Sequence, residues 1–194
     1  MKNLQNKNWN LSGNKNLLQT IIIPVFLLLI CRNLNADSPS WITSSKADTI
    51  PATWHCFRKT FSIDVNPDKA MMKIAVDTKC WLWINDSCVI YEGGVKRGPN
   101  PSDMYYDELD IAPFLKRGEN TMSILVWYWG GKGFSHNSSG RCGLWLNTVI
   151  GDKSLNSDSS WKAMPHPAYL PGRRPKPNFR LSEPNICFDA GKPH

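Results

Sequence analysis

The sequence lacks the short motifs that identify several classes of enzyme. It has no Cys-x-x-Cys pair with histidines in zinc-finger spacing, no Gly-x-Ser-x-Gly elbow, and no phosphate-binding glycine loop before a helix. Its four histidines stand apart, unlike the ligands of a metal site. These absences argue against a zinc finger, a serine hydrolase and a nucleotide-binding enzyme.

A strong excess of one charge is also missing beyond residue 36. The 194 residues include 23 Lys and Arg against 16 Asp and Glu. Four of the bases and none of the acids lie in residues 1–36, which leaves 19 bases against 16 acids. A nucleic-acid-binding protein concentrates Lys and Arg on one face, so this small excess gives weak support for one. We therefore expect no nucleic-acid partner.

Residues 1–36 have the pattern of an export signal. Three lysines precede a nearly wholly apolar run at 17–30, which is short for a membrane span and has the length of a signal-peptide core. We predict cleavage after Ala36 and a periplasmic or extracellular protein. An uncleaved membrane anchor is the alternative. Lipid attachment at Cys31 is disfavoured, because Ile30 stands where a small residue is expected.

Beyond residue 36 no segment keeps a helical period. Short alternating or β-rich runs recur instead, closed by Gly, Pro, Asn or Asp about every ten residues. The expected strands are 57–65, 70–76, 80–84, 89–92, 105–111, 121–129 and 143–150. Several short strands without helices between them predict an all-β fold, an antiparallel β-sandwich.

The turn at 85–87 also bears on the cysteines. It sets Cys88 opposite Trp83 or Asn85 rather than opposite Cys80. Five cysteines lie beyond residue 36, an odd number, and we interpret them as small buried hydrophobes.

Composition divides the remainder into three parts. Residues 37–53 form an N-terminal lead-in, and residues 54–151 form the sandwich, which has the usual size of such a domain. Residues 152–194 are rich in proline, which prevents ladder pairing and favours extended linkers. We interpret this last part as a connector toward a further domain, so that the chain is a truncated form or the front of a longer protein.

Candidate catalytic residues are scarce. A glycosidase needs two opposed carboxylates in different environments. Here the loop and strand acids cluster at 103–110, and strand alternation sends Asp107 and Glu108 to opposite faces. We therefore expect no catalytic residue and no metal ligand in this chain.

Aromatic residues, in contrast, are dense. Trp81 and Trp83 share one face of their strand, and Trp127 and Trp129 share one face of theirs, with Tyr128 on the other. Aromatic faces stack on sugar rings, while polar neighbours bind the hydroxyls. Two interpretations stay open: a platform for sugar, or rings that fill the space between two sheets.

A series of motifs over residues 57–146 adds a resemblance. The motifs, in order, are RKTF at 58–61, WIN at 83–85, RGPNP at 97–101, YYDELDI at 105–111, FLKRGEN at 114–120, VWYWG at 126–130, GFSH at 133–136 and SSG at 138–140. This series resembles the N-terminal β-sandwich module of bacterial α-L-rhamnosidases and related glycoside hydrolases, a jelly roll similar to galactose-binding modules. Asp86 departs from it, because the family pattern has glycine at that turn.

The resemblance implies an accessory module without catalysis of its own, since the family's catalytic acid and base lie in a separate helical barrel downstream. Its partner would be that catalytic domain of the same polypeptide, with rhamnose-containing polysaccharide as a further partner. No cofactor is expected. Some related modules bind rhamnose through calcium, but the resemblance assigns no calcium ligand to a position here.

The candidate sugar contacts combine the two arguments. Trp127 and Trp129 would stack on a sugar ring, and Arg97, Asp107 and His136 would bind its hydroxyls. The alternatives are a stand-alone secreted carbohydrate-binding module and a purely structural domain without a ligand.

Overall fold

The structure is a computed structural model. It describes residues 38–44, 48–95, 100, 103–131, 136–171 and 186–193. The chain divides into two units, Met1–Ala36 and Asp37–His194, and the described residues belong to the second. The predicted export signal therefore lies outside the described residues. Within the described part, no helix is long and apolar enough to cross a membrane.

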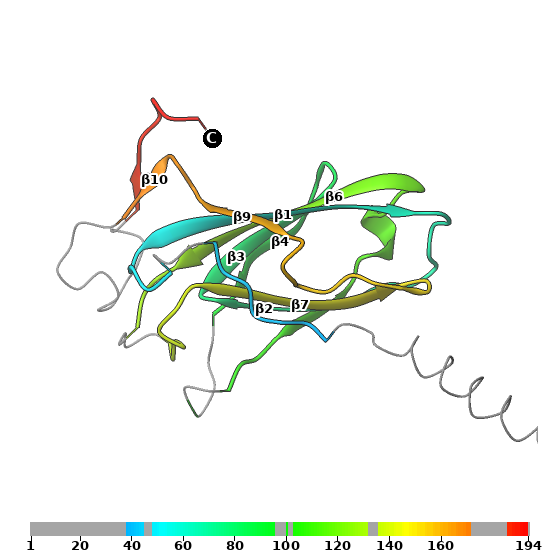
Figure 1. Ribbon diagram of the computed structural model, residues 1–194, viewed down its shortest axis with the longest axis horizontal. Coiled ribbons are helices and arrows are strands. Elements are labelled where there is room, and N and C mark those ends of the chain that lie inside the picture. Colours follow the sequence, from blue (N-terminus) through cyan, green and yellow to red (C-terminus); the bar gives the residue numbers. More distant parts are fainter. Residues whose placement is uncertain are drawn as a thin grey trace, which may run out of the picture. The chain divides into compact units, whose positions relative to one another are not determined.

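The second unit is an antiparallel β-sandwich, as predicted (Figure 1). The larger sheet has the strand order β4-β3-β6-β1-β9, the smaller one β5-β2-β7-β8, and β10 and β11 form a separate pair. The elements are β1 (Thr53–Ile63), β2 (Met71–Asp77), β3 (Lys79–Ile84), β4 (Ser87–Gly94), β5 (Asp107–Asp110), the 3-10 turn η1 (Ala112–Phe114), β6 (Gly118–Tyr128), β7 (Gly143–Ile150), β8 (Lys153–Ser154), β9 (Lys162–Pro165), β10 (Tyr169–Leu170) and β11 (Cys187–Phe188).

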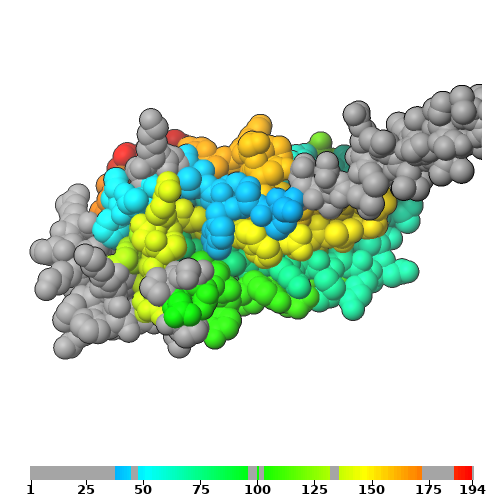
Figure 2. Space-filling model, turned by 60° about the horizontal axis from the view of Figure 1, so that its bottom comes forward, coloured from blue at the N-terminus to red at the C-terminus, as the bar shows by residue number. Residues whose placement is uncertain are grey.

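Alternation along the strands builds the main core. In β6, Met122, Ile124, Val126 and Tyr128 point between the two sheets and are buried. They meet the inward residues of β7 and β2 from the other sheet, such as Leu144, Leu146 and Ile74. The lead-in packs along β7, since Ile42 forms a β-bridge with Leu144 and Ser40 N donates a hydrogen bond to Ser157 O (Figure 2).

The cysteines follow the predicted register, but not all of them are buried as predicted. Cys88 lies opposite Trp83, as predicted. Cys80 and Cys142 are buried, but Cys88 is exposed, and the five described cysteines are all free thiols. The interpretation as buried hydrophobes therefore fails at Cys88, because β4 is an edge strand whose outer side nothing covers in the described part.

The predicted connector contributes strands of its own. β8 pairs with β7, and β9 pairs with β1 at the edge of the larger sheet. The prolines do not prevent this, because Pro165 is the last residue of an edge strand, where a missing N–H is tolerated. Residues 172–185 lie outside the described residues.

Two asparagines tie the predicted turns together. Asn85 adopts a left-handed backbone at φ 53°, and its amide donates to Phe114 O and to Asn120 Oδ1, each at 3.0 Å. Asn120, almost fully buried, accepts from Lys116 N at 2.9 Å and donates to Lys116 O and Gly118 O. Asn120, the last residue of the Gly-Glu-Asn motif and the third of β6, therefore links the start of this strand to the loop before it.

We expect Asn120→Ala to lower the free energy of unfolding by about 2–4 kcal/mol, because it removes a buried amide that makes hydrogen bonds to Asn85, to Lys116 N and O and to Gly118 O. Urea denaturation monitored by circular dichroism measures the loss. The neighbouring exposed variant Glu119→Gln is the control and should stay within about 0.5 kcal/mol of the parent. Equal stability of both variants would contradict this role of Asn120.

Candidate functional site

The tryptophans form a second apolar cluster on the outer face of the larger sheet. Trp54, Trp127 and Trp129 are buried there, and Trp81, Val95, Leu125 and Tyr169 pack against them. The register explains the meeting, since Trp54 of β1 lies directly opposite Trp127 of β6. Tyr128, on the other face of β6, belongs to the core between the sheets.

The rings of this cluster stack closely. Trp54 stacks on Trp127 with centroids 4.7 Å apart and planes 6° apart, and on Tyr169 with centroids 4.1 Å apart. Trp81 lies 5.4 Å from Trp54. Trp129 meets Trp127 edge-on at 5.6 Å, and Lys79 Nζ lies 5.9 Å from the Trp129 centroid. The ring faces of Trp54 and Trp127, which a sugar could use for stacking, are thus in contact with other rings.

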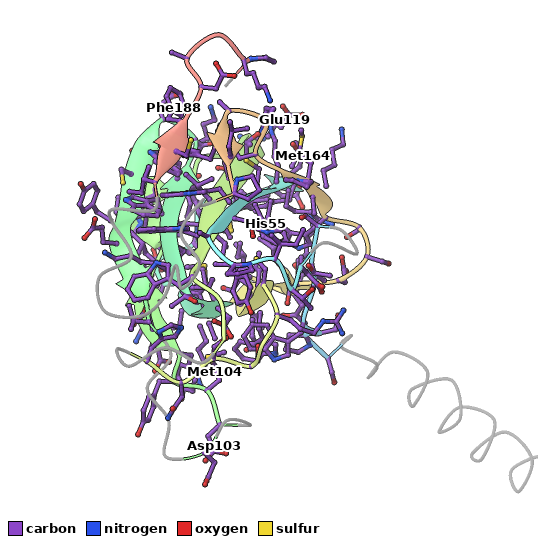
Figure 3. All side chains as sticks on the ribbon, turned by 90° about the vertical axis from the view of Figure 1, so that its left-hand side faces the viewer. His55, Asp103, Met104, Glu119, Met164 and Phe188 are labelled. Carbon is purple, nitrogen blue, oxygen red and sulfur yellow. The ribbon has the colours of Figure 1, made fainter. Side chains whose placement is uncertain are left out.

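A C-terminal segment covers the cluster. Tyr169 of β10 stands in contact with Phe188 of β11 at 5.0 Å and with His166 at 4.8 Å. His166 N donates to Trp54 O at 2.8 Å, which fastens this segment to β1. Figure 3 shows β11, which carries Phe188, at the end of the molecule opposite Asp103.

Packing alone holds the three buried indoles. The described residues supply no hydrogen-bond acceptor to Nε1 of Trp54, Trp127 or Trp129. A buried N–H without a partner costs free energy, and ring stacking and apolar burial offset that cost here. The cluster therefore behaves as a small core, distinct from the one between the sheets.

The predicted site residues separate into two groups. Trp127 and Trp129 are 2% and 8% exposed, and the ring of buried His136 meets Trp129 edge-on at 5.1 Å, so these three lie together. Asp107 is exposed at the start of β5, where its carboxylate accepts a hydrogen bond from Gly94 N at 3.0 Å. Arg97 lies outside the described residues. Their binding of sugar stays a prediction.

Asp77 positions the loop that carries His136. This fully buried carboxylate accepts hydrogen bonds from the Ser138 hydroxyl at 2.9 Å and from the Ser139 N–H and hydroxyl at 2.7 Å each. The serines of the Ser-Ser-Gly motif thus stabilise the buried Asp77 carboxylate by donating hydrogen bonds to it, and the same contacts fix the chain next to Trp129.

Sequence reasoning missed Trp54 and Tyr169. Trp54 precedes the strand expected at 57–65, and Tyr169 lies in the predicted connector. Alternation carried back from Arg58 through Cys56 to Trp54 would have placed Trp54 on the outer face. No local sequence pattern predicts that Tyr169 stacks on Trp54.

A serine and a histidine also meet beneath the lead-in. Ser44 Oγ contacts His55 Nδ1, and Thr53 Oγ1 lies 2.9 Å from Nε2 while donating to Ile50 O. His55 is 1% exposed. Burial lowers its pKa from 6.5 to about 4, against the charge of Asp48, which raises it. The ring of His55 is therefore neutral near pH 7, and hydroxyl groups contact both of its nitrogens.

Among the described residues, no group of three His, Cys, Asp or Glu side chains is arranged to hold a metal ion.

Comparison with known proteins defines the relationship of this sandwich. No protein-family model and no curated protein matches the chain. A solved GH78 family rhamnosidase of Bacillus sp. GL1 is 26% identical, with a TM-score of 0.53, over 66% of this chain and 13% of its own. The α-L-rhamnosidase of Aspergillus terreus is 25% identical, with a TM-score of 0.51, over 69% of this chain and 17% of its own.

The sandwich is similar to a module of the GH78 α-L-rhamnosidases. This confirms the resemblance that the motifs predicted. The chain spans 13% and 17% of the length of these two rhamnosidases, which is consistent with a module of a larger polypeptide.

We expect the stability of the protein to fall as the pH is lowered from about 6.5 to about 4, partly through His55. In that range the unfolded chain takes up a proton at His55 and the folded chain does not, so acid favours unfolding. His55→Gln should flatten this part of the profile. Thermal unfolding of both proteins at several pH values tests this, and parallel profiles would contradict it.

Proposed function

We propose that the chain is an accessory β-sandwich module of an exported α-L-rhamnosidase-like glycoside hydrolase. In this proposal it packs against the catalytic domain, supports it, and hydrolyses nothing itself. The observation that carries the proposal is the coverage: two rhamnosidases match two thirds of this chain but at most 17% of their own length. In those enzymes the matching sandwich is one part among others.

The covered tryptophan cluster supports the structural role. Rings that are buried and stacked on one another, with Tyr169 over Trp54, stabilise the sheet and its C-terminal segment.

A stand-alone carbohydrate-binding module is the second candidate. The gathering of Trp127, Trp129 and His136 on one face favours it. A sugar ring that stacked on Trp54 would have to displace Tyr169, which lies 4.1 Å away. The structural role requires no such movement.

Titration with L-rhamnose separates the two candidates. We expect tryptophan emission of the purified chain to stay unchanged up to millimolar rhamnose, because the rings are already buried in contact with one another. A saturable change in emission that Trp127→Phe abolishes would favour the carbohydrate-binding module instead.

The lack of catalysis is tested with an aryl rhamnoside. The purified chain is expected to release no phenol, whereas a polypeptide that joins it to the catalytic domain is expected to do so. Removing residues 38–171 from the joined polypeptide should lower the unfolding temperature of the catalytic domain. Release by the chain alone, or an unaltered unfolding temperature, would contradict the proposal.

A further inference from the structure

A positively charged pocket lies at the edge of the larger sheet, and its lining includes none of the tryptophans of the outer cluster. It has a volume of about 370 Å³ and is lined by Arg58, Lys59, Thr60, Ser160 and Lys162. β9 begins at Lys162 and pairs with β1 only as far as Arg58. Beyond that point β1 has no neighbour on this side among the described residues, so the pocket occupies the place where the ladder ends.

Two like charges face each other at its rim. Arg58 and Lys162 are direct cross-strand partners, and both are exposed. Like charges at such positions repel and destabilise the sheet. Within the described part of the chain, neither residue takes part in an ion pair, in contrast to Lys73, Lys79, Arg141 and Lys153. A bound anion would relieve this repulsion.

The far wall of the pocket is ordered by a fixed turn. Ser160 N donates to Asp158 Oδ1 at 2.9 Å, and the Ser160 hydroxyl contacts the same oxygen. Trp161 holds the turn down, because it is buried and its Nε1 donates to Asn156 O at 2.9 Å. The wall is therefore in place before any ligand arrives, which reduces the entropy cost of binding.

The charge of Lys59 is already compensated by groups of this wall. Its Nζ donates to Ser160 Oγ, close to the Asp158 carboxylate. Burial alone would raise the pKa of Asp158, but the hydrogen bonds from Ser160 and the charge of Lys59 outweigh it and lower the pKa. Asp158 thus stays ionised opposite Lys59, and the charges of Arg58 and Lys162 remain for a ligand.

We propose that this pocket binds a uronic acid residue of a glycan through its carboxylate. The Arg58 guanidinium and the Lys162 ammonium would hold the carboxylate, and the Thr60 hydroxyl would bind a ring hydroxyl. The volume lies in the range of small-molecule sites and admits a single sugar ring. The choice of a sugar acid over other carboxylates rests on the proposed function. The inference that the pocket binds a carboxylate rests on the charges of Arg58 and Lys162 alone.

Calorimetric titration of the purified chain tests the site with three probes: glucuronate, its uncharged methyl ester, and inorganic sulfate. We expect glucuronate to bind with a millimolar Kd and the ester at least about tenfold more weakly, since one charge-assisted hydrogen bond is worth about that factor. Sulfate keeps the charge but has no ring hydroxyl for Thr60, so we expect it to bind more weakly than glucuronate. Equal binding of glucuronate and the ester, or no binding of glucuronate, would overturn the proposal. Sulfate that binds as well as glucuronate would overturn the sugar-acid assignment.

Matched variants locate the site. Arg58→Gln and Lys162→Gln should each weaken glucuronate at least about threefold, and Arg117→Gln, an exposed cation elsewhere, should leave it unchanged. Unchanged affinity in both pocket variants would overturn the assignment. Because the titration needs neither a catalytic domain nor rhamnose, its failure is distinguishable from failure of the accessory role.

Discussion

The pairing of β1 with β6 is the constraint on which the rest of the structure depends. The two strands run antiparallel in unbroken register over all 11 residues of β1. One set of alternate side chains faces the smaller sheet and forms the main core. The other side chains point to the outer face, where Trp54 lies opposite Trp127 and both belong to the outer cluster. A shift of one residue would exchange the two sets and bury the wrong faces.

β1 is also where the C-terminal part of the chain is attached. β9 pairs with residues 55–58 in its first half, His166 N donates a hydrogen bond to Trp54 O, and Tyr169 stacks on the Trp54 ring. β1 therefore contributes side chains to the main core and to one wall of the charged pocket. It also anchors the segment that packs over the tryptophans. The C-terminal segment is thereby attached to the strand next to β6, the central strand of the larger sheet.

The fold was predictable from the sequence because alternation and turn residues act locally. The Cys88 register and the Gly-Glu-Asn turn follow from a few neighbouring residues. The state of the tryptophans did not follow in the same way. Alternation determines which face Trp127 and Trp129 occupy, but exposure depends on what lies over that face, and Tyr169 comes from a segment whose prolines suggested a linker.

The charged pocket could not be predicted from the composition either, because it depends on contacts between distant parts of the chain. Nineteen bases against 16 acids beyond residue 36 suggest no anionic partner. Arg58 and Lys162 become neighbours only through the β1–β9 register, which pairs residues more than a hundred positions apart. A sheet can avoid this repulsion by placing an acid at either position, as it does at Lys73 and Glu108 on β2 and β5. The proposed carboxylate ligand would supply at Arg58 and Lys162 the negative charge that Glu108 supplies to Lys73.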